Sequence, residues 1–126
     1  MQNILNDSIV RIQNGQKLYF SEIELRSSKI VIDFLKFLYD EGFIRGFEKK
    51  QRNIKVYLKY CNGKPVISLI KTISTKNKRV YMTYSDILKV YSFKEIFVLL
   101  TPKGFCSNKD LLNTNNLGGE VICKIF

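Results

Sequence analysis

The chain has 126 residues, 45% of them hydrophobic, so it can bury one sizeable core or two small ones packed together. Its 21 Lys and Arg residues against 11 Asp and Glu residues give a formal net charge of +10. A small domain needs only about 2 to 8 net charges to stay soluble, so the larger positive charge favours a polyanionic partner. We expect nucleic acid rather than a membrane surface. A membrane span is not expected, because no apolar run approaches the roughly 18 to 20 residues that cross a bilayer, and no secretory signal is recognisable at the N-terminus.

Cysteine usage and codon bias bear on the compartment. Cys61, Cys106 and Cys123 are odd in number and widely spaced, which fits neither a disulfide framework nor a paired-thiol metal site and indicates a reducing compartment. Ala, Trp and His are absent, while Lys, Ile, Asn, Phe and Tyr are frequent. Residue types with GC-rich codons are therefore scarce, which indicates an AT-rich genome. The mitochondrial matrix is the expected location, with a plastid or the cytoplasm of an AT-rich bacterium as alternatives.

The first half of the chain predicts an α-β-α-β-β order. Apolar spacing predicts a helix over residues 2–14, which Gly15 would end in the left-handed conformation. A short strand over residues 22–25 precedes a second helix, capped by Ser27 and Ser28 and ended by Gly42. Period-2 alternation over residues 43–47 and 54–60 then predicts a hairpin.

The second half is expected to be mostly sheet. The sequence Asn62-Gly63-Lys64-Pro65 is the strongest turn signal, so we place a domain boundary there, giving modules over residues 1–62 and 63–126. Strands are predicted over residues 66–73, 79–83, 95–100 and 120–126, with the third buried on both faces. A short helix is expected near residues 84–90, and another after Ser107, where Asp110 completes a capping-box pattern, with its end near Asn116. The predicted fold class is therefore α+β, with a β-rich C-terminal module that contains a short helix.

Catalytic chemistry is not expected. Without His the chain lacks the usual general base near neutral pH and any imidazole to activate Ser or Cys. The acidic pairs Glu22 with Glu24 and Asp40 with Glu41 fall on a predicted exposed strand and at a helix end, where solvated surface is the simpler interpretation. The sequence contains no Gly-rich phosphate-binding motif of a nucleotide-binding kind, and no cofactor is expected.

Binding chemistry remains. Readers of structured RNA need basic side chains, small hydroxyl donors, accessible backbone and a few aromatic surfaces. The loop of residues 100–104, Leu-Thr-Pro-Lys-Gly, supplies several of these after a buried strand: Thr101 can donate, Lys103 carries charge, and Gly104 permits close backbone approach. Such a loop is weak evidence when read alone, since the same residues can form an ordinary turn.

Several segments together resemble the bacterial-type small-subunit ribosomal protein eight family over essentially the whole chain. Residues 7–15, Asp-Ser-Ile-Val-Arg-Ile-Gln-Asn-Gly, are similar to the family's opening helix, and Ser27-Ser28-Lys29 with Glu41-Gly42-Phe43-Ile44 are similar to the two ends of its second helix. Thr101-x-Lys103-Gly104 resembles the family's Ser-Thr-Ser-Lys-Gly loop, and residues 117–123, Leu-Gly-Gly-Glu-Val-Ile-Cys, resemble its closing signature.

The resemblance implies two small α/β modules and a structural constituent of the small ribosomal subunit that is not an enzyme. It implies binding to a central-domain helix of the small-subunit rRNA, support of platform assembly and translation, and neighbouring ribosomal proteins as partners. Most contacts in such proteins go to sugar, phosphate and the shape of the helix. The RNA-binding residues implied by position are Arg11, Asn14, Ser27, Ser28, Lys29, Lys76, Tyr81, Thr101, Lys103, Gly104, Gly118, Gly119 and Glu120.

Some of these residues have a competing structural interpretation. Ser28 can be a helix cap and Tyr81 an ordinary strand residue. Glu120 repels phosphate, so it would either accept a hydrogen bond from a base amino group or fix the glycine turn. Leu100 and Pro102 stand where the family has Ser, which removes two hydroxyls, and the family's Arg-Pro-Gly appears as residues 75–77, Thr-Lys-Asn. Contact with RNA at that loop is expected to be reduced or rearranged.

Two other classes stay open at this point. A free-standing RNA-binding module that regulates messages would share the basic surface, but it would not be expected to match one family from first helix to last strand. A metal-dependent nuclease would need carboxylates clustered on one rim, whereas the acidic residues here are scattered along the sequence.

Overall fold

A computed structural model describes residues 2–75, 77–83, 85, 86, 89, 96–102, 104–108 and 118–126, and the side chains from Ile4 onward in these ranges. The chain forms two compact units, Met1–Leu69 and Ile70–Phe126. The first contains α1 (Gln2–Lys17), β1 (Glu22–Arg26), α2 (Lys29–Asp40), β2 (Ile44–Lys49), β3 (Asn53–Leu58), β4 (Tyr60–Cys61) and β5 (Lys64–Pro65). The second contains β6 (Ile70–Thr72), β7 (Tyr81–Met82), β8 (Ile96–Thr101), β9 (Gly104–Ser107) and β10 (Gly119–Ile125).

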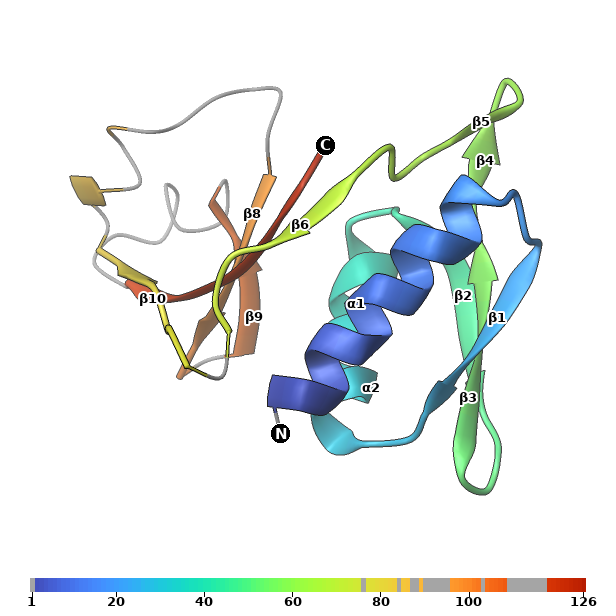
Figure 1. The fold of residues 1–126 in the computed structure, drawn as a ribbon, viewed down its shortest axis with the longest axis horizontal. Helices are drawn as coiled ribbons and strands as arrows, with labels where there is room; N and C mark the ends of the chain where they lie inside the picture. The colour runs from blue at the N-terminus through green and yellow to red at the C-terminus, as the bar shows by residue number, and fades with distance from the viewer. Residues whose placement is uncertain are drawn as a thin grey trace. The chain divides into compact units, whose positions relative to one another are not determined.

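The N-terminal unit is a two-layer sandwich in which α1 and α2 cover one face of an antiparallel sheet of order β1-β3-β2 (Figure 1). Apolar residues at helical spacing on α1 and at period 2 on β3 meet between the layers, as the sequence predicts. The predicted α-β-α-β-β order is confirmed. The buried hydrophobic residues of this unit are Leu5, Ile9, Ile12, Leu25, Val31, Phe34, Leu35, Phe37, Leu38, Ile44, Ile54, Val56, Leu58 and Ile67.

The end of α1 differs from the prediction. The helix continues past Gly15 to Lys17. Gly15 is buried, and a Cβ atom at this position would lie 2.7 Å from Ile23 Cγ2 and 3.0 Å from Leu58 Cδ1. The glycine thus allows close packing of α1 on the sheet. The left-handed residue is Tyr19, with φ 59°, and the Phe20 N–H donates to the Gly15 carbonyl at 2.9 Å. This six-to-one bond closes a Schellman motif without glycine at its left-handed position.

The second helix ends as predicted. Gly42 has φ 83°, its N–H donates to the Tyr39 carbonyl at 3.0 Å, and the Phe43 N–H donates to the Leu38 carbonyl at 2.8 Å. These two bonds form a Schellman motif with glycine at its usual position. The predicted hairpin is also confirmed, with Phe47 opposite Val56 and a bulge between Ile44 and Gly46.

The face of the sheet away from the helices carries a polar network. Lys55 Nζ lies 3.5 Å from Glu22 Oε1, and the Tyr57 hydroxyl donates to Glu48 Oε2 at 3.2 Å. The Glu22 carboxylate raises the pKa of Lys55, and desolvation followed by the bond to Glu48 raises the pKa of Tyr57. Arg45 lies 5.7 Å from the centroid of the Tyr57 ring. The side chains of this face therefore largely satisfy one another.

The Asn-Gly turn forms a small hairpin within the N-terminal unit. Asn62 and Gly63 have φ 54° and 77°, and Cys61 pairs with Lys64, which is the backbone that a two-residue type I′ turn requires. The compact units divide between Leu69 and Ile70, a few residues beyond the boundary proposed from sequence. The domain boundary that divides the chain into modules over residues 1–62 and 63–126 stays a prediction.

The C-terminal unit is a strand-rich sheet of order β6-β10-β8-β9, in which β7 also pairs with β10. Its core centres on Phe97, Leu99 and Val121, with Ile73, Met82 and Cys106 packed against them. The strand β8 is buried at three successive residues, as predicted for a strand covered on both faces. The predicted α+β fold class, with a strand-rich C-terminal part, is confirmed.

The segment after β8 contains a short strand that the sequence did not predict. Gly104–Ser107 forms β9, with Ser107 opposite Val98, and the next residue, Asn108, is helical, in agreement with a helix that starts after Ser107. Ser85, Asp86 and Lys89, the described residues of the helix predicted near residues 84–90, are helical. The other residues of that helix, and residues 109–117 of the helix predicted to end near Asn116, lie outside the described residues.

Candidate nucleic-acid interface

Strand pairing brings the C-terminal candidate residues together at one end of the second sheet. Tyr81 pairs with Glu120 across β7 and β10, and Glu120 pairs with Leu100 across β10 and β8. Thr101, next along β8, pairs with Gly104 to start the β8–β9 hairpin. The sequence could name these residues, but only the pairing of β10 with both neighbours makes them one cluster. We call the set Tyr81, Thr101, Gly104, Gly118, Gly119 and Glu120 the sheet-end cluster.

The side chain of Thr101 stabilises the β8–β9 hairpin of the sheet-end cluster. The Thr101 hydroxyl donates to the Gly104 carbonyl at 2.9 Å, and Thr101 is only 6% exposed. Gly104 has φ 109°, a conformation that L side chains rarely adopt. The hydroxyl thus shapes the turn. Among the described residues of this hairpin, Pro102 is exposed and Gly104 is half-buried.

Gly118 and Gly119 are required by close backbone packing. A Cβ atom on Gly118 would lie 2.5 Å from the Met82 carbonyl oxygen, and one on Gly119 would lie 2.7 Å from the Leu100 carbonyl oxygen. Gly119 does not have a positive φ. The small size of both glycines lets β10 approach β7 and β8, and both remain partly accessible at the sheet end. The glycine turn stays a prediction.

Tyr81 and Glu120 differ sharply in exposure. Tyr81 is 65% exposed and presents an aromatic ring to solvent, which suits stacking on a base or packing on a sugar. Glu120 is 7% exposed, so its carboxylate is poorly placed to accept a hydrogen bond from a base. Nearby, Asp86 accepts from the Thr83 N–H at 3.1 Å, and this bond lowers the pKa of Asp86 and keeps it charged.

The N-terminal candidates lie on α1 and at the start of α2. Arg11 and Asn14 are exposed one helical turn apart, and Arg11 Nη1 donates to the Glu24 carbonyl at 3.4 Å. Ser28 occupies the N-cap position of α2 with extended backbone, yet its side chain makes no capping hydrogen bond. Its hydroxyl is thus not committed to the helix end. Ser27 donates its N–H to the Arg52 carbonyl at 2.9 Å, and Lys29 is exposed.

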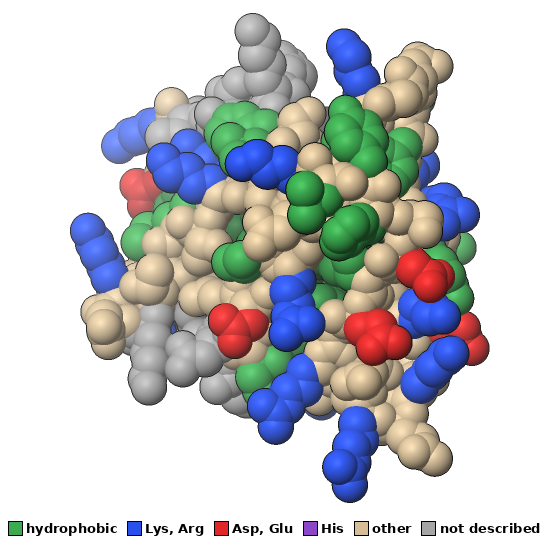
Figure 2. Space-filling model, turned by 45° about the vertical axis from the view of Figure 1, so that its right-hand side comes forward, with side chains coloured by type: hydrophobic (Ala, Val, Ile, Leu, Met, Phe, Trp, Pro, Cys, Tyr) green, Lys and Arg blue, Asp and Glu red, His purple; other side chains and the backbone are tan. Residues whose placement is uncertain are grey.

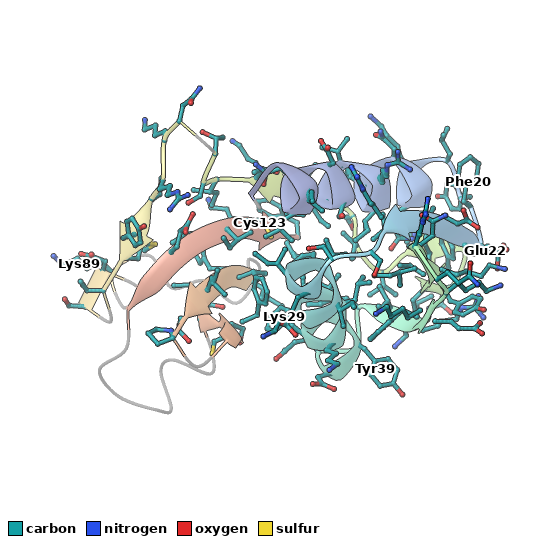
Figure 3. All side chains as sticks on the ribbon, turned by 90° about the horizontal axis from the view of Figure 1, so that it is seen from below. Phe20, Glu22, Lys29, Tyr39, Lys89 and Cys123 are labelled. Carbon is teal, nitrogen blue, oxygen red and sulfur yellow. The ribbon has the colours of Figure 1, made fainter. Side chains whose placement is uncertain are left out.

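Basic side chains are widespread on the described surface. Figure 2 shows Lys and Arg side chains over the visible face, with acidic and hydrophobic side chains interspersed. Figure 3 shows Lys29 at the start of α2 and Tyr39 pointing outward near the end of the same helix. Lys76 and Lys103 lie outside the described residues. The sequence did not single out Arg26 and Arg52 as candidate RNA-binding residues, although Arg26 directly precedes Ser27 and Arg52 adds a positive charge to the β2–β3 turn.

Two features of the described residues bear on other functions. In these parts of the chain, no group of three or more His, Cys, Asp and Glu side chains is placed to hold a metal ion. None of the helices described here is both long and apolar enough to cross a membrane.

Comparison with known proteins decides the family. The family model for ribosomal protein S8 matches residues 3–126. The chain belongs to the ribosomal protein S8 family. It is 39% identical over 127 residues to small ribosomal subunit protein uS8 of Rhodospirillum centenum, covering 97% of this chain and 96% of the relative. It is 37% identical over 131 residues to the uS8 protein of Ruegeria pomeroyi, covering both chains fully.

Family membership confirms the resemblance seen in the sequence. The chain is a structural constituent of the small ribosomal subunit, it is associated with the rRNA and proteins of that subunit, and it takes part in translation. The family is non-enzymatic, in agreement with the expectation from the missing His and the scattered carboxylates. The regulatory module and the nuclease considered from sequence are therefore set aside.

Proposed function

We propose that this chain binds a central-domain helix of the small-subunit rRNA directly and thereby supports assembly of the platform. The observation that carries the proposal is the sheet-end cluster, where an exposed aromatic ring, a short hairpin and two closely packed glycines lie at one end of a rigid sheet. A sheet holds such groups in fixed geometry, which lowers the entropy lost on binding.

Within the sheet-end cluster, some residues would contact the RNA and others would hold the hairpin and β10 in place. Tyr81 would stack on a base or pack on a sugar, and the backbone at Gly104, Gly118 and Gly119 would approach the RNA closely. Thr101 and Glu120 are buried, so their contribution is mainly to hold the hairpin and β10 in place. Lys76 and Lys103 would supply charge through flanking segments.

The N-terminal unit would provide a second set of contacts. Arg11, Asn14 and Lys29 are exposed, and the Ser28 hydroxyl makes no bond to its own helix end. Ser27, Ser28 and Lys29 stand at the start of a twelve-residue helix, where backbone N–H groups and the helix dipole favour a phosphate. Neighbouring ribosomal proteins would cover surface that the RNA leaves free.

We also propose that the ribosome in question is mitochondrial. The support is compositional: Ala is absent and Pro appears only twice, while Lys, Ile and Asn are frequent, as expected for a strongly AT-rich genome. The similar relatives are bacterial, which fits a ribosome of bacterial type in an organelle as well as one in a bacterium. Mass spectrometry of purified mitochondrial and cytoplasmic small subunits from the source organism would separate these locations.

The test of direct binding uses Tyr81. Tyr81→Ala should weaken binding to a central-domain rRNA fragment from the same organism about 5- to 150-fold, because stacking is worth roughly 1 to 3 kcal/mol per base. Tyr81→Phe should retain most of the affinity, since the ring remains. Tyr39→Ala is the matched control, because Tyr39 is also exposed, at 54% against 65% for Tyr81, but lies on α2. Equal affinities of the parent and the Tyr81→Ala variant would exclude the sheet-end cluster as the binding surface.

A further inference from the structure

A groove in the N-terminal unit is lined by three arginines from separate parts of the fold. It has a volume of about 680 Å³ and lies between α1, the edge strand β1 and the β2–β3 turn. Arg11 comes from α1, Arg26 ends β1, and Arg52 belongs to the turn. We call this the arginine groove. Its other lining residues are Ile4, Asp7, Ser8, Val10, Glu24, Leu25 and Asn53.

Backbone hydrogen bonds hold the arginines near one another. Arg26 pairs with Asn53 in the β1–β3 register, and the Ser27 N–H donates to the Arg52 carbonyl at 2.9 Å. Arg26 and Arg52 are thereby fixed on neighbouring backbone segments. Arg11 reaches the same strand from the helix, with Nη1 3.4 Å from the Glu24 carbonyl oxygen.

The guanidinium groups have donors to spare. Each carries five N–H donors, and within the described residues Arg26 and Arg52 make no side-chain hydrogen bond or ion pair. Arg11 has the one bond to the Glu24 carbonyl. Asp7 and Glu24 line the groove as well, yet they form no ion pair with these arginines among the residues described. The groove therefore combines unused donors with two carboxylate acceptors.

We propose that the arginine groove binds the sugar–phosphate backbone of an RNA strand, as a second anchor besides the sheet-end cluster. Planar guanidinium groups match phosphate oxygens with two parallel hydrogen bonds, and they suit such a site better than ammonium groups. The carboxylates of Asp7 and Glu24 can accept hydrogen bonds from the 2′-hydroxyl groups of RNA. An acidic protein segment has no such groups, so the carboxylates favour RNA as the occupant of the groove. The inference rests on the proposed function and extends it to Arg26 and Arg52.

The test compares two double variants that remove equal charge. Arg26→Gln with Arg52→Gln removes two guanidinium groups from the groove, while Lys17→Gln with Lys36→Gln removes two exposed cations that do not line it. Affinity for the central-domain rRNA fragment is measured over a range of salt concentrations. We expect the groove variant to bind at least about 10-fold more weakly and to lower the salt slope by roughly 1.4 to 1.8, as two lost phosphate contacts require. The control should change both values much less.

Equal losses in the two double variants would overturn the groove proposal, since only net charge would then matter. The proposed function would stand in that case, provided that Tyr81→Ala still weakens binding. A parent protein without affinity for the fragment would refute both proposals together. Thermal unfolding by circular dichroism verifies that each variant is folded.

A measurement on the unmodified protein covers the case in which the groove variant does not fold. An arginine-specific dicarbonyl reagent is applied with and without the rRNA fragment, and modified positions are mapped by mass spectrometry. RNA should slow modification of Arg26 and Arg52 at least about fivefold relative to Arg45, whose Nε already donates to the Leu58 carbonyl. Equal rates with and without RNA at Arg26 and Arg52 would overturn the proposal.

Discussion

The rings of Tyr19 and Tyr60 stack with centroids 5.5 Å apart and planes inclined by 14°. Tyr19 is the left-handed residue that ends α1, and the Tyr60 hydroxyl donates to the carbonyl of the next residue, Phe20, at 2.5 Å. Tyr60, from β4, thus stabilises the end of α1, where the left-handed position is occupied by Tyr19 instead of glycine. The stacking contact offsets part of the strain at Tyr19.

Tyr60→Phe should lower the free energy of unfolding by about 0.5 to 1.5 kcal/mol, because it removes the hydroxyl donor and keeps the stacked ring. Tyr60→Ala should cost more, since the ring is lost as well. Urea titrations followed by circular dichroism measure both effects. Tyr39→Phe, at a hydroxyl without a described hydrogen bond, should leave stability unchanged. A Tyr60→Phe variant as stable as the parent would show that the bond to Phe20 contributes nothing.

Gly15→Ala should destabilise the protein although alanine favours helices. The substitution gains about 1 kcal/mol of helix propensity, but the new methyl group would lie 2.7 Å from Ile23 Cγ2 and force repacking that costs roughly 1 to 3 kcal/mol. A net loss of up to about 2 kcal/mol is expected in urea titrations. Gly46→Ala is the control, since nothing lies within 4 Å of its added Cβ. Higher stability of the Gly15→Ala variant would contradict the packing described here.

Cys123 should make stability fall at high pH. Burial raises the pKa of this thiol to about 12, whereas the unfolded thiol ionises near its ordinary value. Between these values the unfolded state binds fewer protons, so this residue lowers the free energy of unfolding by about 1.4 kcal/mol for each pH unit above 9. The Cys123→Ala variant lacks this contribution and should show a shallower decline from pH 9 to 10.5. Parallel slopes for the two proteins would rule it out.

The cysteines should also differ in reactivity. Cys61 is exposed and Cys123 is buried, so a thiol reagent at pH 8 should label Cys61 rapidly and reach Cys123 only when the C-terminal unit opens. Mass spectrometry of labelled peptides over time resolves the two sites. Rapid labelling of Cys123 in the native protein would contradict the packing of β10.

Thr101→Val should act on stability before it acts on binding. The hydroxyl is committed to the Gly104 carbonyl inside the hairpin, and its loss should cost about 0.5 to 1.5 kcal/mol of unfolding free energy. Where the protein remains folded, rRNA affinity should change less than about threefold. Thr72→Val, on β6 and without a described side-chain bond, controls for the loss of a hydroxyl from the sheet. A tenfold loss of affinity in folded Thr101→Val would instead assign this hydroxyl to the RNA.

The sequence predicts most of the fold because the decisive signals are local. Helical spacing of Leu5, Ile9 and Ile12 and the alternation along β3 identify their elements without knowledge of the partners. Gly15 and the strand β9 were misread, because Gly15 is required by contacts with β1 and β3, and β9 owes its conformation to pairing with β8. Neither cause is visible in a short window of sequence.

The candidate residues follow the same division. Family motifs point to Tyr81 and Gly119, but the exposure of Tyr81 and the burial of Thr101 depend on how β7, β8 and β9 pair. Arg26 and Arg52 were missed because they are 26 residues apart in the sequence, and only the β1–β3 register brings them to one groove.

The position of β10 has a consequence for how the protein is made. This strand is last in sequence, yet it pairs with β6 and β7 along one edge and with β8 along the other. During synthesis the sheet of the N-terminal unit can therefore form before β10 is made. Until then, β6, β7 and β8 of the C-terminal unit lack the strand with which all three pair. Nascent chains interrupted before residue 119 would expose unpaired strand edges, and these truncated products should be the ones that aggregate or recruit chaperones.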